Sequence, residues 1–206
     1  MRARFITLEG GEGAGKSTQA RRLADALAAA GLPALRTREP GGAPGAERLR
    51  QLLLSGDAAW SPLAETLLHF AARAEHVAQT IRPALEAGIW VVCDRFADST
   101  MAYQGHGQGA DRAAIANLSG MIGLVPDLTL VLDVSAATGA ARLAARGLGA
   151  DRYERLGPEF FARVNAGFRA IAAAEPRCAI VSAEDSEEAV AARVLSVVRD
   201  RLGVPA

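Results

Sequence analysis

The sequence is poor in cysteine and has no excess charge of either sign. Its 206 residues contain only Cys93 and Cys178, too few for a disulfide framework or a four-thiolate zinc site. The 23 basic and 23 acidic residues balance, so no global field attracts nucleic acid polymers or anionic membranes, although a local basic patch stays possible. We therefore expect a protein of the reducing cytoplasm that binds neither a nucleic acid polymer nor a membrane.

Long apolar runs are also absent. No run approaches the roughly 18 residues that a membrane-spanning helix requires. The first residues lead directly into an apolar segment, without the separate hydrophobic stretch and cleavage site of a signal peptide. Hydrophobic residues make up 50% of the chain and charged residues 22%, which is typical of a globular protein. The length favours one domain over residues 1–206.

Short apolar runs alternate with Ala- and Leu-rich segments of helical character. The expected strands cover residues 5–8, 34–38, 89–93, 128–132 and 179–181. Helices are expected at 16–30, 46–54 and 187–202, and over a longer stretch, 62–87, in which Pro83 predicts a kink or break. Because the middle strands are too apolar to face water, the alternation predicts an α/β fold: a parallel, five-stranded sheet with helices on both faces.

A glycine-rich segment matches the phosphate-loop pattern and lies between a predicted strand and a predicted helix. It reads Gly10-Gly11-Glu12-Gly13-Ala14-Gly15-Lys16-Ser17, followed by Thr18. Backbone N–H groups of such a loop point at phosphate oxygens, and the helix N-terminus adds partial positive charge. Lys16 is expected to reach the β- and γ-phosphates, and the Ser17 hydroxyl to ligate Mg²⁺. The segment therefore predicts a site for a nucleoside triphosphate with Mg²⁺.

Absent motifs and the short length limit the classes of phosphate-loop protein to which this chain can belong. A GTPase normally carries an Asn-Lys-x-Asp motif after a late strand, but Lys16 is the only lysine in the chain. A motor or a partitioning ATPase is disfavoured by the short length. A small-molecule kinase needs an acceptor pocket, cations that follow the moving phosphoryl charge, and a lid that excludes water.

Candidates for each of these parts follow the predicted strands. Arg38 ends the second strand and Asp94-Arg95 follows the third, at the edge of a parallel sheet where ligands gather. There an arginine can fork onto a phosphate, and a carboxylate can hold Mg²⁺ through water. After the fourth strand, a glycine-interrupted stretch predicts a mobile lid over about residues 142–156. Its arginines are Arg142, Arg146, Arg152 and Arg155.

Taken together, these motifs resemble the bacterial thymidylate kinase family nearly end to end. Many enzymes share the phosphate loop, but two other motifs are more specific. They are Arg38-Glu39-Pro40-Gly41-Gly42, and Asp94-Arg95-Phe96 followed by Ala102-Tyr103-Gln104-Gly105. The resemblance implies a P-loop nucleoside monophosphate kinase-like fold that transfers the γ-phosphoryl group of ATP to dTMP, with Mg²⁺, giving dTDP. It also implies a homodimer, for which the apolar faces near 64–87 and 113–124 can serve as interface or as core.

The resemblance assigns the catalytic and phosphate-binding roles. Lys16, Arg95 and Asp94 would act in catalysis, with Asp94 and Ser17 organising Mg²⁺. Arg38 and Arg95 would hold the phosphate of dTMP. Because the acceptor is a phosphate oxygen that is already anionic, no strong general base is required, and catalysis is expected to be positioning plus charge neutralisation.

The nucleoside would be read by a second set of side chains. The resemblance places Glu12 against the deoxyribose 3′-OH and Tyr103 where it crowds out a 2′-OH. The thymine would be surrounded by Gln104, Ser99, Arg73 and Arg50. From the residues alone, Arg50 and Ser99 can equally be solvated or capping residues.

The position of the catalytic arginines divides the family. An acidic residue in the phosphate loop, here Glu12, and arginines in the lid make this chain resemble the lid-arginine type. Arg146 and Arg152 are then expected to neutralise charge on the transferring phosphoryl group. Arg142 can instead be a charge on a helix surface.

One position departs from the family pattern. Four residues before the thymine-contacting arginine the family commonly has a Phe that stacks on the base, but counting back from Arg73 reaches His69, with Phe70 one residue later. Positions three and four apart share a helix face, so either ring can stack and both are candidate substrate residues. His76 and His106 suggest no metal or nucleophilic chemistry and are interpreted as ordinary polar residues.

Two other functions stay open at this point. A kinase for another monophosphate, such as dUMP or AMP, would use the same motifs. A nucleotide-dependent switch or partitioning ATPase would hydrolyse slowly without an acceptor and respond to a partner, but it would leave the pairing of Arg38 with Arg95 unexplained.

Overall fold

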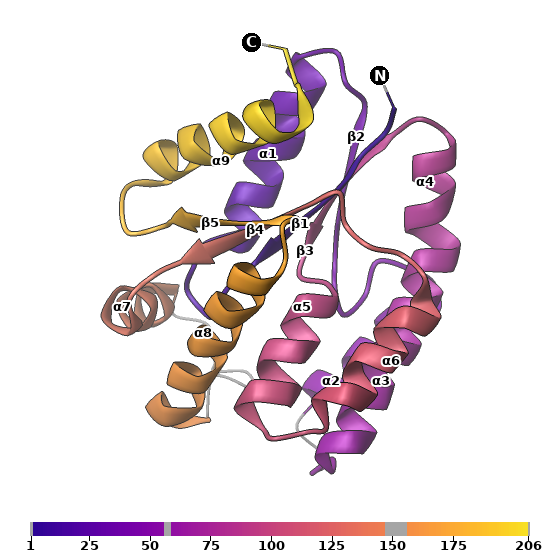
Figure 1. The fold of residues 1–206 in the computed structure, drawn as a ribbon, viewed down its shortest axis with the longest axis vertical. Coiled ribbons are helices and arrows are strands. Elements are labelled where there is room, and N and C mark those ends of the chain that lie inside the picture. Colours follow the sequence, from indigo (N-terminus) through magenta and orange to yellow (C-terminus); the bar gives the residue numbers. More distant parts are fainter. Residues whose placement is uncertain (1, 56–58, 147–155, 206) are drawn as a thin grey trace.

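The computed structural model describes residues 2–55, 59–146 and 156–205. Its parallel strands form one five-stranded sheet in the order β2-β3-β1-β4-β5 (Figure 1). The strands are β1 (Phe5–Glu9), β2 (Ala34–Arg38), β3 (Trp90–Asp94), β4 (Leu128–Asp133) and β5 (Cys178–Ser182). The predicted fold class is confirmed, and the predicted strands form with ends shifted by at most one residue.

Helices cover both faces of this sheet. On one face, α1 (Lys16–Ala29) and α9 (Glu187–Leu202) lie side by side and bury Leu8 and its apolar neighbours (Figure 1). On the other face, Phe5 packs beneath the end of the long helical stretch, and Val131 packs beneath α8 (Gly157–Ala174). Since successive side chains of a strand point to opposite faces, the continuous apolar runs in the sequence fill both layers of core.

The remaining helices are α2 (Pro44–Leu54), α3 (Pro62–His76), α4 (Arg82–Glu86), α5 (Ala97–Thr100), α6 (Arg112–Ile122) and α7 (Ala136–Arg146). Their termini follow local sequence signals. Ser61 caps α3 by accepting a hydrogen bond from the Ala64 N–H, and Ser186 caps α9 in the same way. Within the residues described, no helix combines the length and apolar character needed to cross a membrane.

The long helical stretch is interrupted one turn earlier than Pro83. A π-helical turn, Val77–Ile81, joins α3 to α4, and the Arg82 N–H bonds to the Val77 carbonyl, five residues back. Proline has no N–H for an α-helical bond, and a widened turn directly before it shifts the hydrogen-bond register. The expected break at Pro83 is therefore a change of helix type rather than an end.

The carboxyl ends of the central strands bring distant residues together. Asp94, the last residue of β3, pairs in register with Leu8 of β1 on one side and with Arg38 of β2 on the other. The phosphate loop follows β1 immediately. This edge therefore gathers the phosphate loop, the end of β2 and the end of β3 in one place.

Candidate active site

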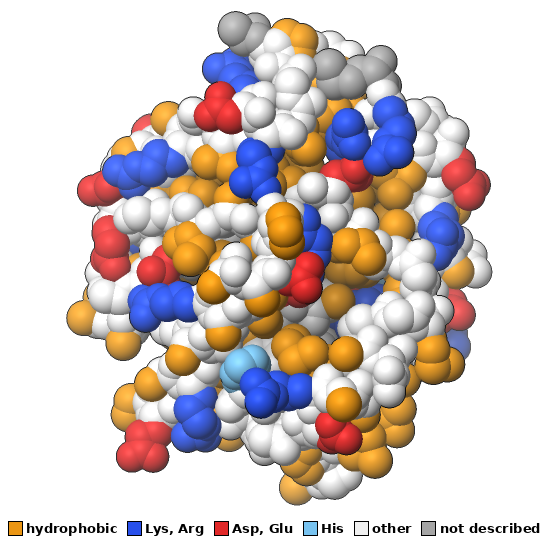
Figure 2. All heavy atoms as spheres, viewed as in Figure 1, with side chains coloured by type: hydrophobic (Ala, Val, Ile, Leu, Met, Phe, Trp, Pro, Cys, Tyr) orange, Lys and Arg blue, Asp and Glu red, His pale blue; other side chains and the backbone are white. Residues whose placement is uncertain are grey.

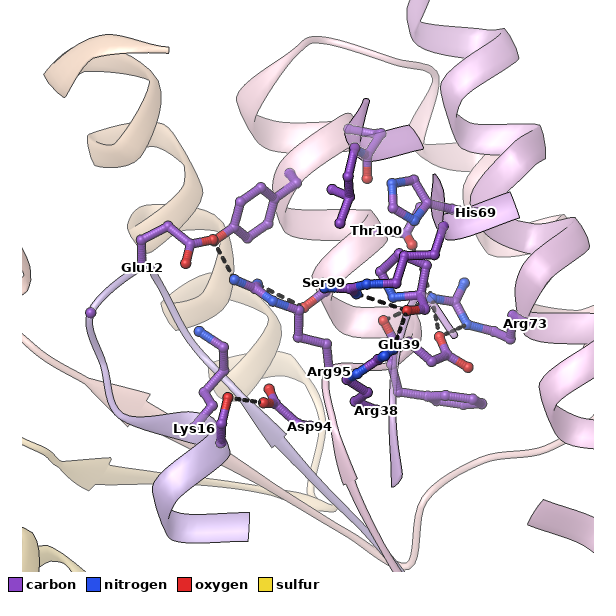
Figure 3. A pocket seen from close by; sticks show the side chains of 18 of the residues that line it. Glu12, Lys16, Arg38, Glu39, His69, Arg73, Asp94, Arg95, Ser99 and Thr100 are labelled. Atoms are coloured by element: carbon purple, nitrogen blue, oxygen red, sulfur yellow. Dashed lines mark hydrogen bonds and ion pairs between the residues drawn. The ribbon is translucent and has the colours of Figure 1, made fainter. Parts of the chain in front are cut away.

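A cavity opens at this edge, lined by the phosphate loop, the ends of β2 and β3, and helices α3 and α5. Figure 3 shows Lys16 and Asp94 on one side and Arg73 on the other, with Arg95 between them reaching toward Glu12. The expected site residues that line it are Glu12, Gly13, Gly15, Lys16, Ser17, Arg38, Arg50, His69, Arg73, Asp94, Arg95, Ser99, Tyr103 and Gln104. Arg50 and Ser99 thus face the cavity rather than solvent alone.

The phosphate loop holds its lysine by backbone contacts. The Lys16 ammonium donates to the carbonyls of Gly10 and Gly11, at 3.0 and 2.6 Å. Gly13, with φ 72°, lies so close to α7 that a Cβ there would be 2.3 Å from the Gly139 carbonyl oxygen, so only glycine fits. Burial, with a further contribution from Arg95, lowers the pKa of Lys16 to about 8, although Glu12 opposes this shift.

Ser17 and Asp94 meet beside the lysine. The Ser17 hydroxyl donates to Oδ2 of Asp94 at 2.5 Å. A hydroxyl and a carboxylate are hard oxygen ligands of the kind that Mg²⁺ prefers, with water and nucleotide phosphates completing the shell. Within the described chain, no group of three or more His, Cys, Asp or Glu side chains could hold a metal without such help. The residues present therefore fit a magnesium ion brought in with a nucleotide.

Glu12 joins the phosphate loop to Arg95 and Tyr103. Its carboxylate accepts a very short hydrogen bond from Arg95 and one of 2.8 Å from the Tyr103 hydroxyl. Burial would raise the pKa of Glu12, but Arg95 and Lys16 outweigh it and lower the pKa to about 2. Glu12 therefore stays ionised and holds Arg95, whose guanidinium also lies 4.8 Å from the centroid of the Tyr103 ring.

Arg38 and Arg50 meet around Pro40. Each donates to the Pro40 carbonyl, at 3.0 and 2.8 Å, and Arg38 also pairs with Glu47 at 3.1 Å. The side chain of Arg38 is 44% exposed, so this contact leaves it accessible to an anion in the cavity. The Glu39–Pro40 peptide bond is cis.

Arg73 is held from several directions. Its Nε donates to Glu39 at 2.8 Å and its NH2 donates to the Phe96 carbonyl at 2.9 Å. The side chain is 2% exposed, yet it lines the cavity, and among the described residues its NH1 has no hydrogen-bond partner. The Phe70 ring lies against this guanidinium, 4.7 Å from it, and is absent from the cavity lining. His69, on the same helix, lines the cavity.

Three features escaped the sequence analysis. Glu39 is buried and pairs with both Arg73 and His76, which follow it by 34 and 37 residues in the sequence. The interpretation of His76 as an ordinary polar residue is wrong, because it is fully buried between Glu39 and the Thr37 hydroxyl. A π-helical segment, Met101–Gly107, carries Tyr103 into the site. The Arg-Glu-Pro motif was the only signal pointing to Glu39.

Of the predicted lid, about residues 142–156, the structure describes 142–146 and 156. Arg142 donates to the carbonyls of Asp185 and Gly13, at 3.1 and 3.4 Å, so this half-buried side chain ties α7 to the phosphate loop from the helix surface. The expected positions of Arg152 and Arg155, and the side chain of Arg146, lie outside the described residues.

The match to the family model for thymidylate kinase spans residues 8–194. This chain belongs to the thymidylate kinase family. The thymidylate kinase of Caulobacter vibrioides is 53% identical over 204 residues, covering 97% of this chain and 98% of that protein. That of Gluconobacter oxydans is 55% identical over 206 residues, covering 97% and 96%. The crystal structure of thymidylate kinase from Ehrlichia chaffeensis matches with a TM-score of 0.80 at 33% identity, covering 96% of this chain and 100% of that one.

As a thymidylate kinase, the chain is an enzyme that transfers the γ-phosphoryl group of ATP to dTMP with Mg²⁺, giving dTDP for nucleotide biosynthesis. The alternative of a switch or partitioning ATPase is therefore wrong. In this kinase Arg38 and Asp94-Arg95, which the sequence predicts to act at the acceptor, share one cavity with the phosphate loop.

Proposed function

We propose that this cavity performs the transfer by holding two phosphate groups from opposite sides. Lys16 and Ser17 would hold the β- and γ-phosphates of ATP, and Arg38 and Arg95 would hold the phosphate of dTMP. The observation that carries the proposal is that these cations line one cavity. Burial is the largest cause of the lowered pKa of Lys16, and Arg95 is close enough to lower it further. Two neighbouring cations that repel each other favour an anion between them.

The proposed chemistry needs no proton abstraction by the protein. The attacking oxygen of dTMP is already anionic, so the protein has only to align it and neutralise charge. When bound through Ser17 and Asp94, Mg²⁺ would neutralise negative charge on the phosphates of ATP. Arg95 would stay charged throughout, because although burial opposes it, Glu12 raises its pKa well above the ordinary value.

Selection of the deoxynucleoside would rest on the walls of the cavity. Glu12 would accept from the 3′-OH, and Tyr103, held by Glu12, would exclude a 2′-OH. Arg73, whose side chain lines the cavity, would donate to a carbonyl of the base. The other proposed base contacts are Gln104, Ser99, Arg50 and His69, with Phe70 supporting Arg73 from behind.

An ADP-release assay with matched acceptors tests this assignment. We expect turnover with dTMP, less with dUMP, little with the ribonucleotide of thymine, and none without acceptor. Arg95→Met should raise KM for dTMP at least tenfold, since charged hydrogen bonds are lost. Arg169→Met is the control, because Arg169 pairs with Asp133 at the surface. An unchanged KM in Arg95→Met would contradict the proposal.

The lid is proposed to complete the charge balance. Residues 142–156 would close over ATP within a single kinase domain spanning residues 1–206, and Arg146 and Arg152 would contact the transferring phosphoryl group. Arg146→Ala should then lower kcat by on the order of 10²–10³, as loss of a preorganised donor does. Arg193→Ala, which removes an exposed pair with Asp185, is the control. Equal turnover in both variants would refute the role of the lid.

A second copy of this chain is the proposed partner, and the cytoplasm the proposed location. Leu63 and Leu67, one turn apart on α3, are 58% and 47% exposed, and Met121 at the end of α6 is 82% exposed. Figure 2 shows apolar side chains at the lower right edge, where α3 and α6 lie in Figure 1. Large apolar side chains left in solvent on neighbouring helices favour an interface.

Light scattering after gel filtration tests the dimer. Leu67→Glu should convert the protein to a monomer, because it places a charge in the interface without disturbing a buried residue. Ile180→Glu is the control, since Ile180 is 51% exposed on β5, away from α3. A monomeric wild-type protein, or a dimer that survives Leu67→Glu, would contradict this part of the proposal.

A further inference from the structure

Glu9 is a fully buried acidic residue beside the site, outside the cavity lining. It is the last residue of β1 and has no exposed surface. Alternation along the strand places it on the same face as Phe5 and Thr7, opposite to Leu8. A buried charge in this position is unfavourable unless it is paired and hydrogen-bonded.

Both oxygens of Glu9 bind the segment that follows β3. Oε1 accepts from the Phe96 N–H at 2.7 Å, and Oε2 accepts from the Ser99 hydroxyl at 2.5 Å. The Ser99 N–H in turn bonds the Phe96 carbonyl. One carboxylate therefore fixes both ends of the turn that starts α5.

Arg95 lies directly between β3 and this turn, in a strained backbone conformation. It is the one described residue other than glycine with positive φ, 69°, a region that a residue with a Cβ adopts only when its surroundings hold it there. Its own N–H bonds the Leu8 carbonyl at 3.0 Å, and the next N–H, of Phe96, bonds Glu9. Two consecutive residues of β1 thus hold the two peptide units on either side of Arg95.

The side chain of Arg95 is reached by the same network. Its NH1 donates to the Ser99 hydroxyl at 3.4 Å, and Ser99 donates to Glu9. We propose that Glu9 is a positioning residue for the acceptor phosphate: it holds the left-handed turn at Arg95 and, through Ser99, the direction of the Arg95 guanidinium. This inference rests on the proposed role of Arg95 in binding dTMP.

The electrostatics separate this role from a purely structural one. The charged or titratable groups around Glu9 are Asp98 on α5, Arg95, Lys16 on α1 and Cys93 on β3. Burial, followed by Asp98, raises the pKa of Glu9 from 4.5 to about 7. Because the folded pKa lies above the unfolded one, ionised Glu9 weakens the fold, increasingly as the pH rises from about 4.5 to 7 and constantly above that. Replacing it with a neutral side chain should therefore spare stability and still harm positioning.

The experiment compares Glu9→Gln with Asp127→Asn. Asp127 makes the same kind of contact at the other end of β1, accepting from the Phe5 N–H at 2.9 Å and from Arg4 at 2.8 Å. In Glu9→Gln we expect KM for dTMP to rise about tenfold or more, as when a charged hydrogen bond is lost. KM for ATP should stay within about twofold, and Tm at pH 8 should be unchanged or higher. Asp127→Asn should lower Tm and leave both KM values unchanged.

Two further variants make every result decisive. Ser99→Ala, which removes the hydroxyl between Glu9 and Arg95, should also raise KM for dTMP, and it serves if Glu9→Gln does not fold. Because Ser99 would act through Arg95 rather than through the base, it should raise KM no further in an Arg95→Met background. Arg95→Met tests the proposed role of Arg95 in binding dTMP separately from the role of Glu9. If Arg95→Met raises KM for dTMP but Glu9→Gln and Ser99→Ala do not, the inference is overturned and the proposed function stands. If Arg95→Met has no effect, both fall. A Glu9→Gln protein that loses Tm and weakens both substrates equally would show a structural role only and would also overturn the inference.

Discussion

The two sides of the cavity are built by different means. On the side proposed to bind ATP, the donor side, Lys16 bonds carbonyls that lie five and six residues before it. On the side proposed to bind dTMP, the acceptor side, Arg95 contacts Glu12 across 83 residues of sequence, and Arg73 contacts Glu39 across 34. The donor side is therefore a local backbone structure, whereas the acceptor side exists only after the sheet has joined β1, β2 and β3.

Because of this contrast, substitutions on the two sides should affect catalytic rate and fold stability differently. A side chain of the phosphate loop can be removed with little loss of packing, because the glycine backbone keeps its path. Glu39 and Arg73 on the acceptor side form a buried pair, so removing either leaves another charge without its partner. Removing Lys16 should therefore lower activity alone, whereas breaking this buried pair should lower stability as well.

The largest expected effect is on the donor side. Lys16→Ala should lower kcat by on the order of 10²–10³, because a donor aimed at the moving phosphoryl charge is lost, while Tm changes little. Arg21→Ala is the matched control, since Arg21 lies on the same helix in an exposed pair with Asp25. Unchanged steady-state turnover in Lys16→Ala would remove the donor side from the mechanism.

Glu39→Gln tests the acceptor side. Glu39 and Arg73 are 4% and 2% exposed, and breaking a buried pair from one side lowers the free energy of unfolding by about 3 kcal/mol or more. Urea denaturation measures this loss, and KM for dTMP should rise along with it. If Glu39→Gln has normal stability, the network around Arg73 does not depend on the Glu39 carboxylate.

The pKa of Lys16 gives a third test. Because burial lowers it from 10.5 to about 8, the fraction of free amine rises as the pH passes about 8, and amine acetylation should follow that curve. The chain has a single lysine, so peptide mapping compares only Lys16 with the terminal amine. ATP with Mg²⁺ should protect Lys16 alone. Modification that begins only near pH 10, or that ATP does not slow, would contradict the described environment.

The smallest expected change in stability is at the rim of the cavity, the exposed pair of Arg38 and Glu47. Glu47→Gln removes the partner of Arg38, but both side chains are more than 40% exposed, at 42% and 44%. Exposed ion pairs contribute about 0–1 kcal/mol, so urea denaturation should detect a change below about 1 kcal/mol. A loss similar to that in Glu39→Gln would show that the contrast between rim and interior is drawn wrongly.

The sequence predicts the local parts of this molecule well. The five strands and the loop Gly10–Ser17 depend on short patterns of apolar residues and glycines, and such patterns act over a few residues. Arg38, Asp94 and Arg95 were found because parallel strands present their carboxyl ends at one edge. These features need no knowledge of what lies across the sheet.

Long-range contacts are where the prediction stops. No sequence motif around His76 predicts its contacts, and only the fold shows that it is buried against Glu39 and Thr37. The sequence does not distinguish Arg142 from any other helix-surface arginine, and only the position of α7 beside the phosphate loop shows its contact with Gly13. Pro83 predicts an interruption of the helix, but it does not specify that the turn before it is π-helical. The roles of Arg146, Arg152 and the base-contacting residues stay predictions.

A crystal structure of the enzyme with dTMP, ADP and Mg²⁺ tests the central claim most directly. The account predicts the phosphate of dTMP within hydrogen-bond distance of Arg38 and Arg95, and the β-phosphate of ADP against Lys16 and the phosphate-loop N–H groups. A thymidine nucleotide bound away from both arginines, or an ADP that does not touch Lys16, would contradict it.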